Sequence, residues 1–364
     1  MRMNTKYICV LGILTAVSLV LRVSAAGAAA DSAKVSKQRV VKTLVLIYNP
    51  VLAGQENKKL TEFMGWHDPH KQTLEAAKAL KEASGGFAEF KIVKTIELNK
   101  FPMKRDGFRY DEASFLDMWK HREKAHQADS ISYQAIFDEN KITSQVMSGE
   151  VDEVWIWGAP YFGYDEYAMK VPGDKLFYAT TNPWFYRPYD IPDCGRMVWV
   201  MGFNYERGVA EAVHSFGHRC EGILSLTVGK GQWYEAEPGN SWRAFSLQDV
   251  DHPGEAGVGN VHGGPNAQSG YDYAQRKSVM CTAEDWLNYP NLTGKKTSIS
   301  CENWGGPDYQ LNYMKWYLCH LPKTQGATSG VYNNWWQYIV NYDEAVKLLP
   351  PPGGSLNKAT QATF

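Results

Sequence analysis

Four runs with the composition of strands, separated by stretches of helical composition, constrain the fold of this chain more than any other feature. The runs are VVKTLVLIY (40–48), FAEFKIVKTIEL (87–98), VDEVWIWG (151–158) and RMVWVMGF (196–203). Short runs rich in β-branched and aromatic residues are typical of buried strands, and helices between successive strands favour parallel pairing with right-handed crossovers. The sequence therefore predicts an open, mostly parallel, Rossmann-like α/β sheet over residues 39–228, with helices on both faces.

Helices are expected between these strands and after them. Residues 72–83 (QTLEAAKALKEA) have helical composition and end before a pair of glycines that can cap a helix. Further helices are expected near residues 111–125 and 132–148. The last strand leads into an amphipathic helix within residues 202–224, GFNYERGVAEAVHSFGHRCEGIL, whose valines, Phe216 and Cys220 share one apolar stripe.

The second half of the chain differs in amino-acid composition from the sheet region. Over residues 229–349, Gly, Asn, Trp and Tyr dominate, and helices are expected only at 308–320 and 335–349. This stretch is predicted to be a loop-rich aromatic elaboration packed on the sheet core, followed by a tail at 350–364. The chain has 13 Trp and 21 Tyr, and this abundance fits either sugar-stacking surfaces or an aromatic core.

The N-terminus has the pattern of a signal peptide. Arg2 and Lys6 precede an apolar run over residues 7–21, and small residues follow it in VSAAGAAAD. Such a run is shorter than the roughly 20 residues of a membrane span, so residues 1–30 are interpreted as a cleaved secretory signal. The mature protein is expected to be secreted or periplasmic, without a membrane span.

Charge and cysteine content limit the partners and the chemistry. The formal net charge is −1 and no long run of Lys or Arg occurs, so binding to nucleic acid is not expected. Export permits disulfides, and five of the six cysteines remain after removal of the signal. Among these, Cys281, Cys301 and Cys319 lie in the irregular second half, where a disulfide would stabilise the fold most.

A pair of histidines on the helix of residues 202–224 is the strongest candidate for a site. His214 and His218 are one turn apart on the face opposite the apolar stripe, with Glu211 and Glu221 on either side. Such spacing suits a divalent metal, and zinc is the expected ion, since its catalytic sites use three protein ligands and an open position. The third ligand is expected to be Glu221 or His262, which lies among glycines in GNVHGGP (259–265).

The histidine pair resembles the zinc-binding helix of metallopeptidases in its i, i+4 spacing. Those enzymes carry a glutamate directly after the first histidine as general base, and this chain has Ser215 there. The resemblance stops at the two histidines, so a different base would be needed, with Glu211 and Glu221 as the candidates. Arg219 and Ser215 are expected to support the site or contact the substrate. If the histidines only face water, they have no such role.

A second candidate site lies at the carboxyl ends of the predicted strands, where open α/β sheets bind ligands. The polar and aromatic residues expected there are Asn49, Tyr161, Glu166, Asn204 and Glu206. Because the helix rises about 1.5 Å per residue, His214 would lie roughly 15 Å from Asn204, so the two sites are expected to be separate. Trp184 and its aromatic neighbours could line a sugar cleft or form a packed cluster.

Three functions remain open from the sequence alone. The first is an exported metal-dependent hydrolase of an extracellular peptide or glycan, with His214, His218 and His262 or Glu221 as ligands. The second is a non-catalytic exported protein that binds polysaccharide or cell-wall polymer through its aromatic second half. The third is a metal-free glycosidase with paired carboxylates, whose candidates are Glu166, Glu206, Asp272 and Glu302.

Overall fold

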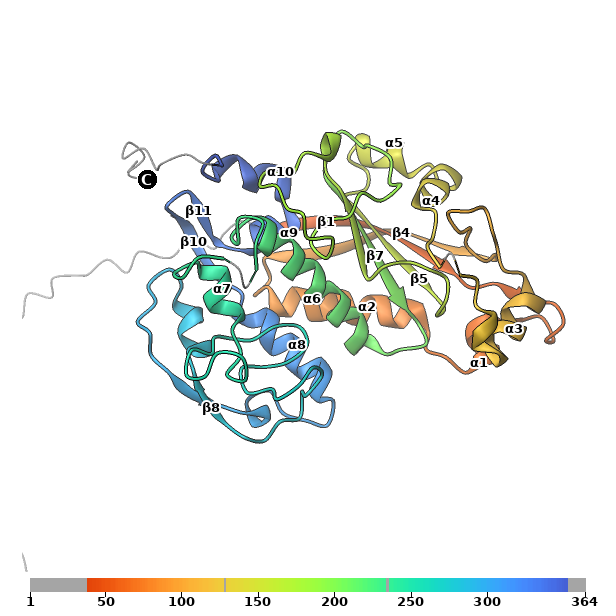
Figure 1. Ribbon diagram of the computed structural model, residues 1–364. Coiled ribbons are helices and arrows are strands. Elements are labelled where there is room, and N and C mark those ends of the chain that lie inside the picture. The colour runs from red at the N-terminus through yellow and green to blue at the C-terminus, as the bar shows by residue number, and fades with distance from the viewer. Residues whose placement is uncertain (1–37, 128, 234–235, 353–364) are drawn as a thin grey trace, which may run out of the picture. The chain divides into compact units, whose positions relative to one another are not determined.

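The computed structural model describes residues 38–127, 129–233 and 236–352, and its core is a five-stranded mixed sheet of order β4-β1-β5-β7-β6 (Figure 1). Four strands are parallel: β1 (Arg39–Tyr48), β4 (Ala88–Leu98), β5 (Glu153–Gly158) and β7 (Val198–Asn204). The edge strand β6 (Tyr167–Lys170) pairs antiparallel with β7 and was not predicted. The α/β class and the four predicted strands are confirmed.

The sheet is buried on both faces. Every residue of β5 is buried, and neighbouring side chains on a strand face opposite sides, so both sides of this strand are covered. The helices α2 (Pro69–Ala83) and α6 (Val209–Leu226) lie on one side, and α4 (Tyr133–Glu139) and α5 (Ile142–Met147) lie on the other (Figure 1). The sequence pattern predicted such apolar strands with helices on both faces of the sheet.

Three of the expected helices are interrupted, and the one expected over 335–349 is divided into α9 (Trp336–Val340), α10 (Tyr342–Ala345) and the 3-10 turn η5 (Val346–Leu348). The helix expected over 132–148 is broken into α4 and α5 because Lys141 adopts a left-handed backbone conformation with φ of 55°. The helix expected over 111–125 ends earlier, since α3 (Glu112–Lys120) is followed by one 3-10 turn, η1 (Arg122–Lys124). Earlier in the chain, β1 is followed by β2 (Val51–Leu52), β3 (Lys58–Lys59) and α1 (Leu60–Met64).

The residues after α6 form short elements. In chain order they are α7 (Ser241–Ser246), β8 (Val279–Cys281), η3 (Ala283–Asn288), β9 (Thr297–Ile299), η4 (Cys301–Asn303), α8 (Tyr309–His320), β10 (Lys323–Thr328), β11 (Val331–Asn334), α9 (Trp336–Val340), α10 (Tyr342–Ala345) and η5 (Val346–Leu348). Both α8 and α9 contact α6. The aromatic residues of this stretch are largely core, because Trp242, Trp286, Trp335 and Trp336 are almost fully buried.

Helix α6 is buried on nearly all sides, which its sequence alone did not indicate. It contacts β6 and β7 of the sheet and also α2, α8 and α9, and on the face that carries the histidines His214 is buried and His218 is half-buried. Gly217 makes this possible, since a Cβ there would lie 2.8 Å from Val261 and 2.6 Å from Met314. The glycine therefore lets α8 and the chain around Val261 pack directly against the helix.

Some predictions fall outside the described residues or find no counterpart in them. The signal peptide at 1–30 and most of the tail at 350–364 are outside. The cysteines at 194, 220, 281, 301 and 319 are all free, so no disulfide joins the described cysteines. Over the same residues, none of the helices is both long and apolar enough to cross a membrane.

Candidate metal centre

His262 reaches the histidine face of α6 from a tight turn in the 258–264 loop. The turn is closed by two backbone hydrogen bonds, from Asn260 N to Gly263 O and from Gly263 N to Asn260 O, both 3.1 Å. Gly259 has φ of 99° and lies so close to Gly263 and Gly264 that a Cβ would approach within 2.5 Å. Glycines are therefore required to form the turn that presents His262.

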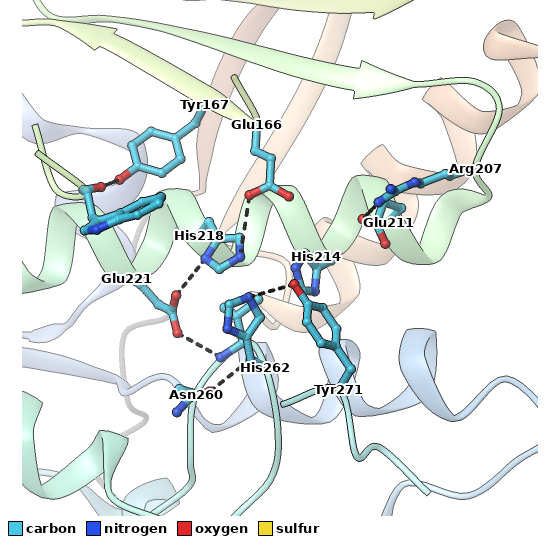
Figure 2. Close-up of polar contacts among 12 residues, drawn as sticks. Glu166, Tyr167, Arg207, Glu211, His214, His218, Glu221, Asn260, His262 and Tyr271 are labelled. Carbon is cyan, nitrogen blue, oxygen red and sulfur yellow. Dashed lines mark hydrogen bonds and ion pairs between the residues drawn. The ribbon is translucent and has the colours of Figure 1, made fainter. Parts of the chain in front are cut away.

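The carboxylate of Glu221 connects the helix to this turn. One oxygen accepts a hydrogen bond from His218 Nδ1 at 2.9 Å, and the other accepts one from Val261 N at 2.8 Å (Figure 2). Because a carboxylate only accepts, Nδ1 of His218 carries a proton, and Nε2 of the neutral ring has a free lone pair. Glu221 thus orients His218 as carboxylates orient metal-binding histidines in known sites.

Tyr273 orients His214 as Glu221 orients His218. Its hydroxyl lies 3.1 Å from His214 Nδ1 and donates its proton to Val261 O at 3.0 Å. A hydroxyl has one proton, so the imidazole must donate at Nδ1, and its Nε2 is left with a lone pair. The loop that supplies His262 is therefore attached at Val261 by the same two groups that orient the other histidines.

The three rings meet around one small space (Figure 2). Ring centroids are 4.8 Å apart for His214 and His218, 4.8 Å for His218 and His262, and 5.5 Å for His214 and His262. One nitrogen from each ring lies within 4.8 Å of the others, which is a separation that a single metal ion can bridge. We call His214, His218 and His262 the histidine cluster.

Glu166 and Glu211 add carboxylates beside the cluster. Glu166 Oε2 lies 3.5 Å from His218 Nε2, the nitrogen that Glu221 leaves free (Figure 2). One carboxylate oxygen from each glutamate also lies within 4.8 Å of a His214 nitrogen. Glu211 is engaged by Arg207 and by Gln310 Nε2 at 2.8 Å, whereas Glu166 is 45% exposed and faces the open side of the site.

The position of Glu166 depends on a glycine in the neighbouring strand. Gly202 N donates to Glu166 O at 3.1 Å, and a Cβ on Gly202 would lie 2.3 Å from Asp165 O. The chain between β5 and β6 can therefore pass close to β7 and turn the Glu166 side chain toward α6. The sequence grouped Glu166 with the strand ends, and the structure places its carboxylate beside His218.

The burial of the cluster sets its protonation. Burial, helped by the neighbouring histidines, lowers the pKa of His214 to about 3, so this ring is neutral at pH 7. Burial and His218 likewise lower the pKa of His262. Burial opposes a charge on His218, but its hydrogen bond to Glu221 and the charges of Glu221, Glu166 and Glu211 outweigh this and raise its pKa. Burial raises the pKa of Glu166.

Tyr271 stands over the cluster at its exposed side. Its hydroxyl lies 3.3 Å from His262 Nε2, and the residue is 61% exposed (Figure 2). Its backbone has φ of 65°, which is uncommon and costly for a residue with a large side chain. Neither Tyr271 nor Tyr273 was singled out from the sequence, where the only signal was two tyrosines shortly after the glycine-rich turn.

Arg219 lies apart from the histidine cluster. It is fully buried, and it donates to Glu153 Oε2 and Ile339 O, both at 2.8 Å. Because Glu153 begins β5 and Ile339 is in α9, the guanidinium is bonded within the core. Arg219 is therefore a structural residue in this geometry, and Ser215 is buried on the same helix.

Apart from Glu166, the residues expected at the strand ends are not among those gathered at the histidine cluster. Asn49 is buried and bonds with Thr61 and Glu97, and Asn204 Oδ1 accepts from Glu206 N at 2.9 Å. Tyr161 accepts a bond from Lys104 Nζ at its carbonyl oxygen, 2.6 Å away. Of the four residues predicted to bind substrate, Trp184 is the most exposed, at 78%.

Replacing Glu221 with glutamine should weaken metal binding without removing a ligand. His218 Nδ1 and Val261 N donate to different oxygens of Glu221, and glutamine replaces one of these oxygens with an NH2 donor, so one of the two bonds is lost and the imidazole and the His262 loop lose their common anchor. Loss of such a supporting group lowers metal affinity by about 10–100-fold. Titration against a chromogenic chelator measures the change, with the exposed Glu75→Gln on α2 as control. Equal affinities for Glu221→Gln and wild type would contradict this role.

The low pKa of His214 predicts how the stability of the metal-free protein depends on pH. As pH falls below about 6.5, residue 214 takes up a proton in the unfolded chain but not in the folded chain. The free energy of unfolding should therefore fall by up to about 1.4 kcal/mol per pH unit from this group. His218 acts oppositely, since its raised pKa contributes stability that is lost as pH rises.

Urea unfolding of chelated protein between about pH 6 and 4.5 tests this dependence. His214→Gln keeps a polar group beside Tyr273 but cannot titrate, so its unfolding free energy should fall less steeply with acid than that of wild type. Parallel curves for the two proteins would show that His214 is readily protonated in the folded state.

Comparisons of the chain with protein-family models, with curated proteins and with solved structures gave no match. Function is therefore inferred from the geometry of the site itself.

Proposed function

We propose that this chain is an exported metal-dependent hydrolase, with zinc as its cation, that acts on an extracellular peptide or glycan. The supporting observation is the convergence of three imidazoles from α6 and the 258–264 loop, two of them held with a free Nε2 lone pair by Glu221 and Tyr273. Three imidazole donors with an open fourth position are one of the ligand sets of catalytic zinc sites. Export rests on the N-terminal sequence pattern, and the proposed architecture is a Rossmann-like sheet whose C-terminal segment completes the site.

The donor set fits the proposed cation. The three imidazoles supply borderline nitrogen ligands, and neutral rings at His214 and His262 can bind without first losing a proton. A divalent cation held there would act as a Lewis acid on a carbonyl oxygen and make a water molecule more acidic. The site is most buried at His214, and Glu166 and Tyr271 lie at its exposed side, so a substrate can approach from there.

Glu166 is the best candidate for the general base. Glu221 uses both carboxylate oxygens on His218 and Val261, and Glu211 is held by Arg207 and Gln310. Glu166 alone of these carboxylates is near the cluster with one face open to solvent. It can take a proton from water and return it to the leaving group. Tyr271 is placed to donate a hydrogen bond to the substrate.

The metal-free glycosidase is supported less well. Glu302 is 68% exposed and paired with Arg276, while Asp272 accepts from Gln275 Nε2 at 2.7 Å. Glu206 lies beside Arg207. The carboxylates that do come together are Glu166 and Glu211, with oxygens within 4.8 Å, but they share their space with His214. A cation site accounts for this arrangement better than a pair of carboxylates that flank a sugar.

Metal analysis of the full chain, purified without chelator, tests the proposal. We expect about one equivalent of zinc, loss of the metal on dialysis against a strong chelator, and recovery with zinc or cobalt. Cobalt bound by nitrogen donors gives visible absorption bands that report the ligand set directly. Hydrolysis of 4-nitrophenyl acetate should follow the metal content. Protein that neither contains a transition metal nor binds cobalt would exclude the proposal.

A further inference from the structure

A cavity lies next to the histidine cluster. It has a volume of about 270 Å³ and lies between the chain around β6 and the segment 183–189. Its wall includes Asp165, Glu166 and Tyr167 on one side and Trp184, Arg187 and Tyr189 on the other. We call it the Trp184 pocket.

The pocket and the cluster share a wall. Glu166 borders the pocket and also directs its carboxylate to His218 (Figure 2). The next residue, Tyr167, packs on α6, where a Cβ on Gly222 would lie 2.3 Å from the Tyr167 hydroxyl. That hydroxyl donates to Trp184 O (Figure 2). Gly222 is one helical turn beyond His218, so Tyr167 packs close to the histidine cluster. Because Glu166 lines the pocket, a ligand there would lie beside this proposed general base.

The lining of the pocket suits a sugar ring. Trp184 is 78% exposed, so its indole presents a flat apolar face to solvent at the edge of the cavity. Arg187 and Asp165 form an ion pair of 3.2 Å that offers donors and an acceptor side by side. A pyranose has apolar C–H faces and a rim of hydroxyl groups, and it therefore needs both kinds of surface within one pocket.

An extended peptide fits this place less well. The strand β6 is the edge of the sheet, where a peptide could add as a further strand. However, the 183–189 segment lies across it, and Tyr189 donates to Tyr167 O at 3.4 Å. The carbonyl oxygen of Tyr167, one of the groups that a peptide strand could pair with, thus already accepts a hydrogen bond. In the pocket wall Asp165 compensates Arg187 and the carboxylate of Glu166 is directed to His218, so the lining offers no uncompensated cation for an acidic peptide side chain.

We infer that the Trp184 pocket is a saccharide subsite and that the substrate is an acylated glycan. This inference rests on the proposed hydrolase, whose chemistry acts on a carbonyl group. A pyranose ring has none, so the bond cleaved is the acyl–oxygen or acyl–nitrogen bond of a substituent. Water oxygen adds to the acyl carbon, Glu166 carries the water proton to the departing sugar oxygen or nitrogen, and the products are a carboxylic acid and a free hydroxyl or amine.

Isothermal titration calorimetry with two probes tests the subsite. The probes are chitopentaose, which is N-acetylated, and acetylated xylan oligosaccharides, and acetate release is measured in parallel. Wild type should bind at least one of them and release acetate. Trp184→Ala should lower the glycan affinity by about tenfold or more, because it removes the stacking face. It should fold normally, since the side chain is exposed, and it should keep its metal. Leu74→Ala, which removes an exposed apolar side chain from α2, is the matched control.

The outcomes separate the two proposals. Metal-loaded wild type that hydrolyses 4-nitrophenyl acetate but binds neither glycan would overturn the subsite and leave the hydrolase standing. Unchanged glycan affinity in Trp184→Ala would do the same. Equal competition by an unacylated peptide rich in aromatic residues would assign the pocket to peptides and overturn the inference. Trp184-dependent glycan binding by a protein that binds no metal would support the subsite and exclude the hydrolase.

Discussion

Alanine at His214, His218 or His262 should each remove stoichiometric zinc from the purified protein. Each substitution deletes one of the three nitrogen donors whose ligand atoms lie within 4.8 Å of one another. Loss of a direct ligand should exceed the roughly 10–100-fold effect of a supporting residue, so we expect affinities at least about 100-fold weaker than wild type. Metal content by mass spectrometry and competition with a chromogenic chelator measure the loss.

Among these variants, His262→Ala best separates loss of the metal ligand from loss of stability. His214 is 1% exposed, so its replacement also leaves a cavity in the core and can lower stability for that reason alone. His262 lies on a turn whose anchors are Val261 and Asn260, and its removal leaves those bonds in place. Thermal unfolding of the chelated variants separates the two effects. His70→Ala, at an exposed histidine on α2, is the control and should bind zinc as wild type does. Full zinc content in His262→Ala would rule out the three-histidine centre.

Glu166→Gln should keep the metal and lose hydrolysis. The glutamine has nearly the same shape but cannot accept a proton at neutral pH, and removal of a general base typically costs about 10²–10⁴-fold in rate. Zinc content should stay at the wild-type level, because the three imidazoles and their supports Glu221 and Tyr273 are untouched. Steady-state hydrolysis of 4-nitrophenyl acetate, corrected for bound zinc, gives the comparison.

Glu206→Gln is the matched control for this variant. Glu206 precedes α6 and pairs with Arg207, and it is not one of the carboxylates gathered at His214, so the hydrolysis rate of this variant should equal that of wild type. If Glu166→Gln instead loses its zinc, Glu166 is a ligand and another group must act as base. If it keeps both zinc and full activity, the assignment of Glu166 is wrong.

The sequence predicted the scaffold well because the scaffold depends on local patterns. The four parallel strands were recognisable from short runs of β-branched and aromatic residues, and α2, α6 and α8 from helical composition. Strand β6 was missed because four residues, YAMK, carry too little periodicity to separate a strand from a loop. Breaks such as the one at Lys141 depend on a single backbone conformation and have no composition signal.

The candidate site was only partly predictable. The pairing of His214 with His218, and the flanking Glu211 and Glu221, follow from helical periodicity alone. Sequence also suggested His262, because glycines around a histidine permit close approach. Glu166 was noticed but assigned to the strand ends, since nothing in the chain shows that the segment before β6 turns back toward α6. Arg219 is next to His218 in sequence, yet about 100° of rotation per residue directs it into the core.

The sequence by itself determined which residues could share a helix face and which runs could form the sheet. Both follow from fixed backbone geometry, with a repeat of 3.6 residues in a helix and of 2 residues in a strand. Only the tertiary structure decided that the polar face of α6 is buried rather than wet. That burial depends on contacts between residues far apart in the chain, chiefly Glu221 with Val261 and Tyr273 with His214, and on Gly217, which lets them approach. No local periodicity encodes such contacts, so the same stripe of histidines fits a solvated surface and a metal centre equally well until the rest of the chain is in place.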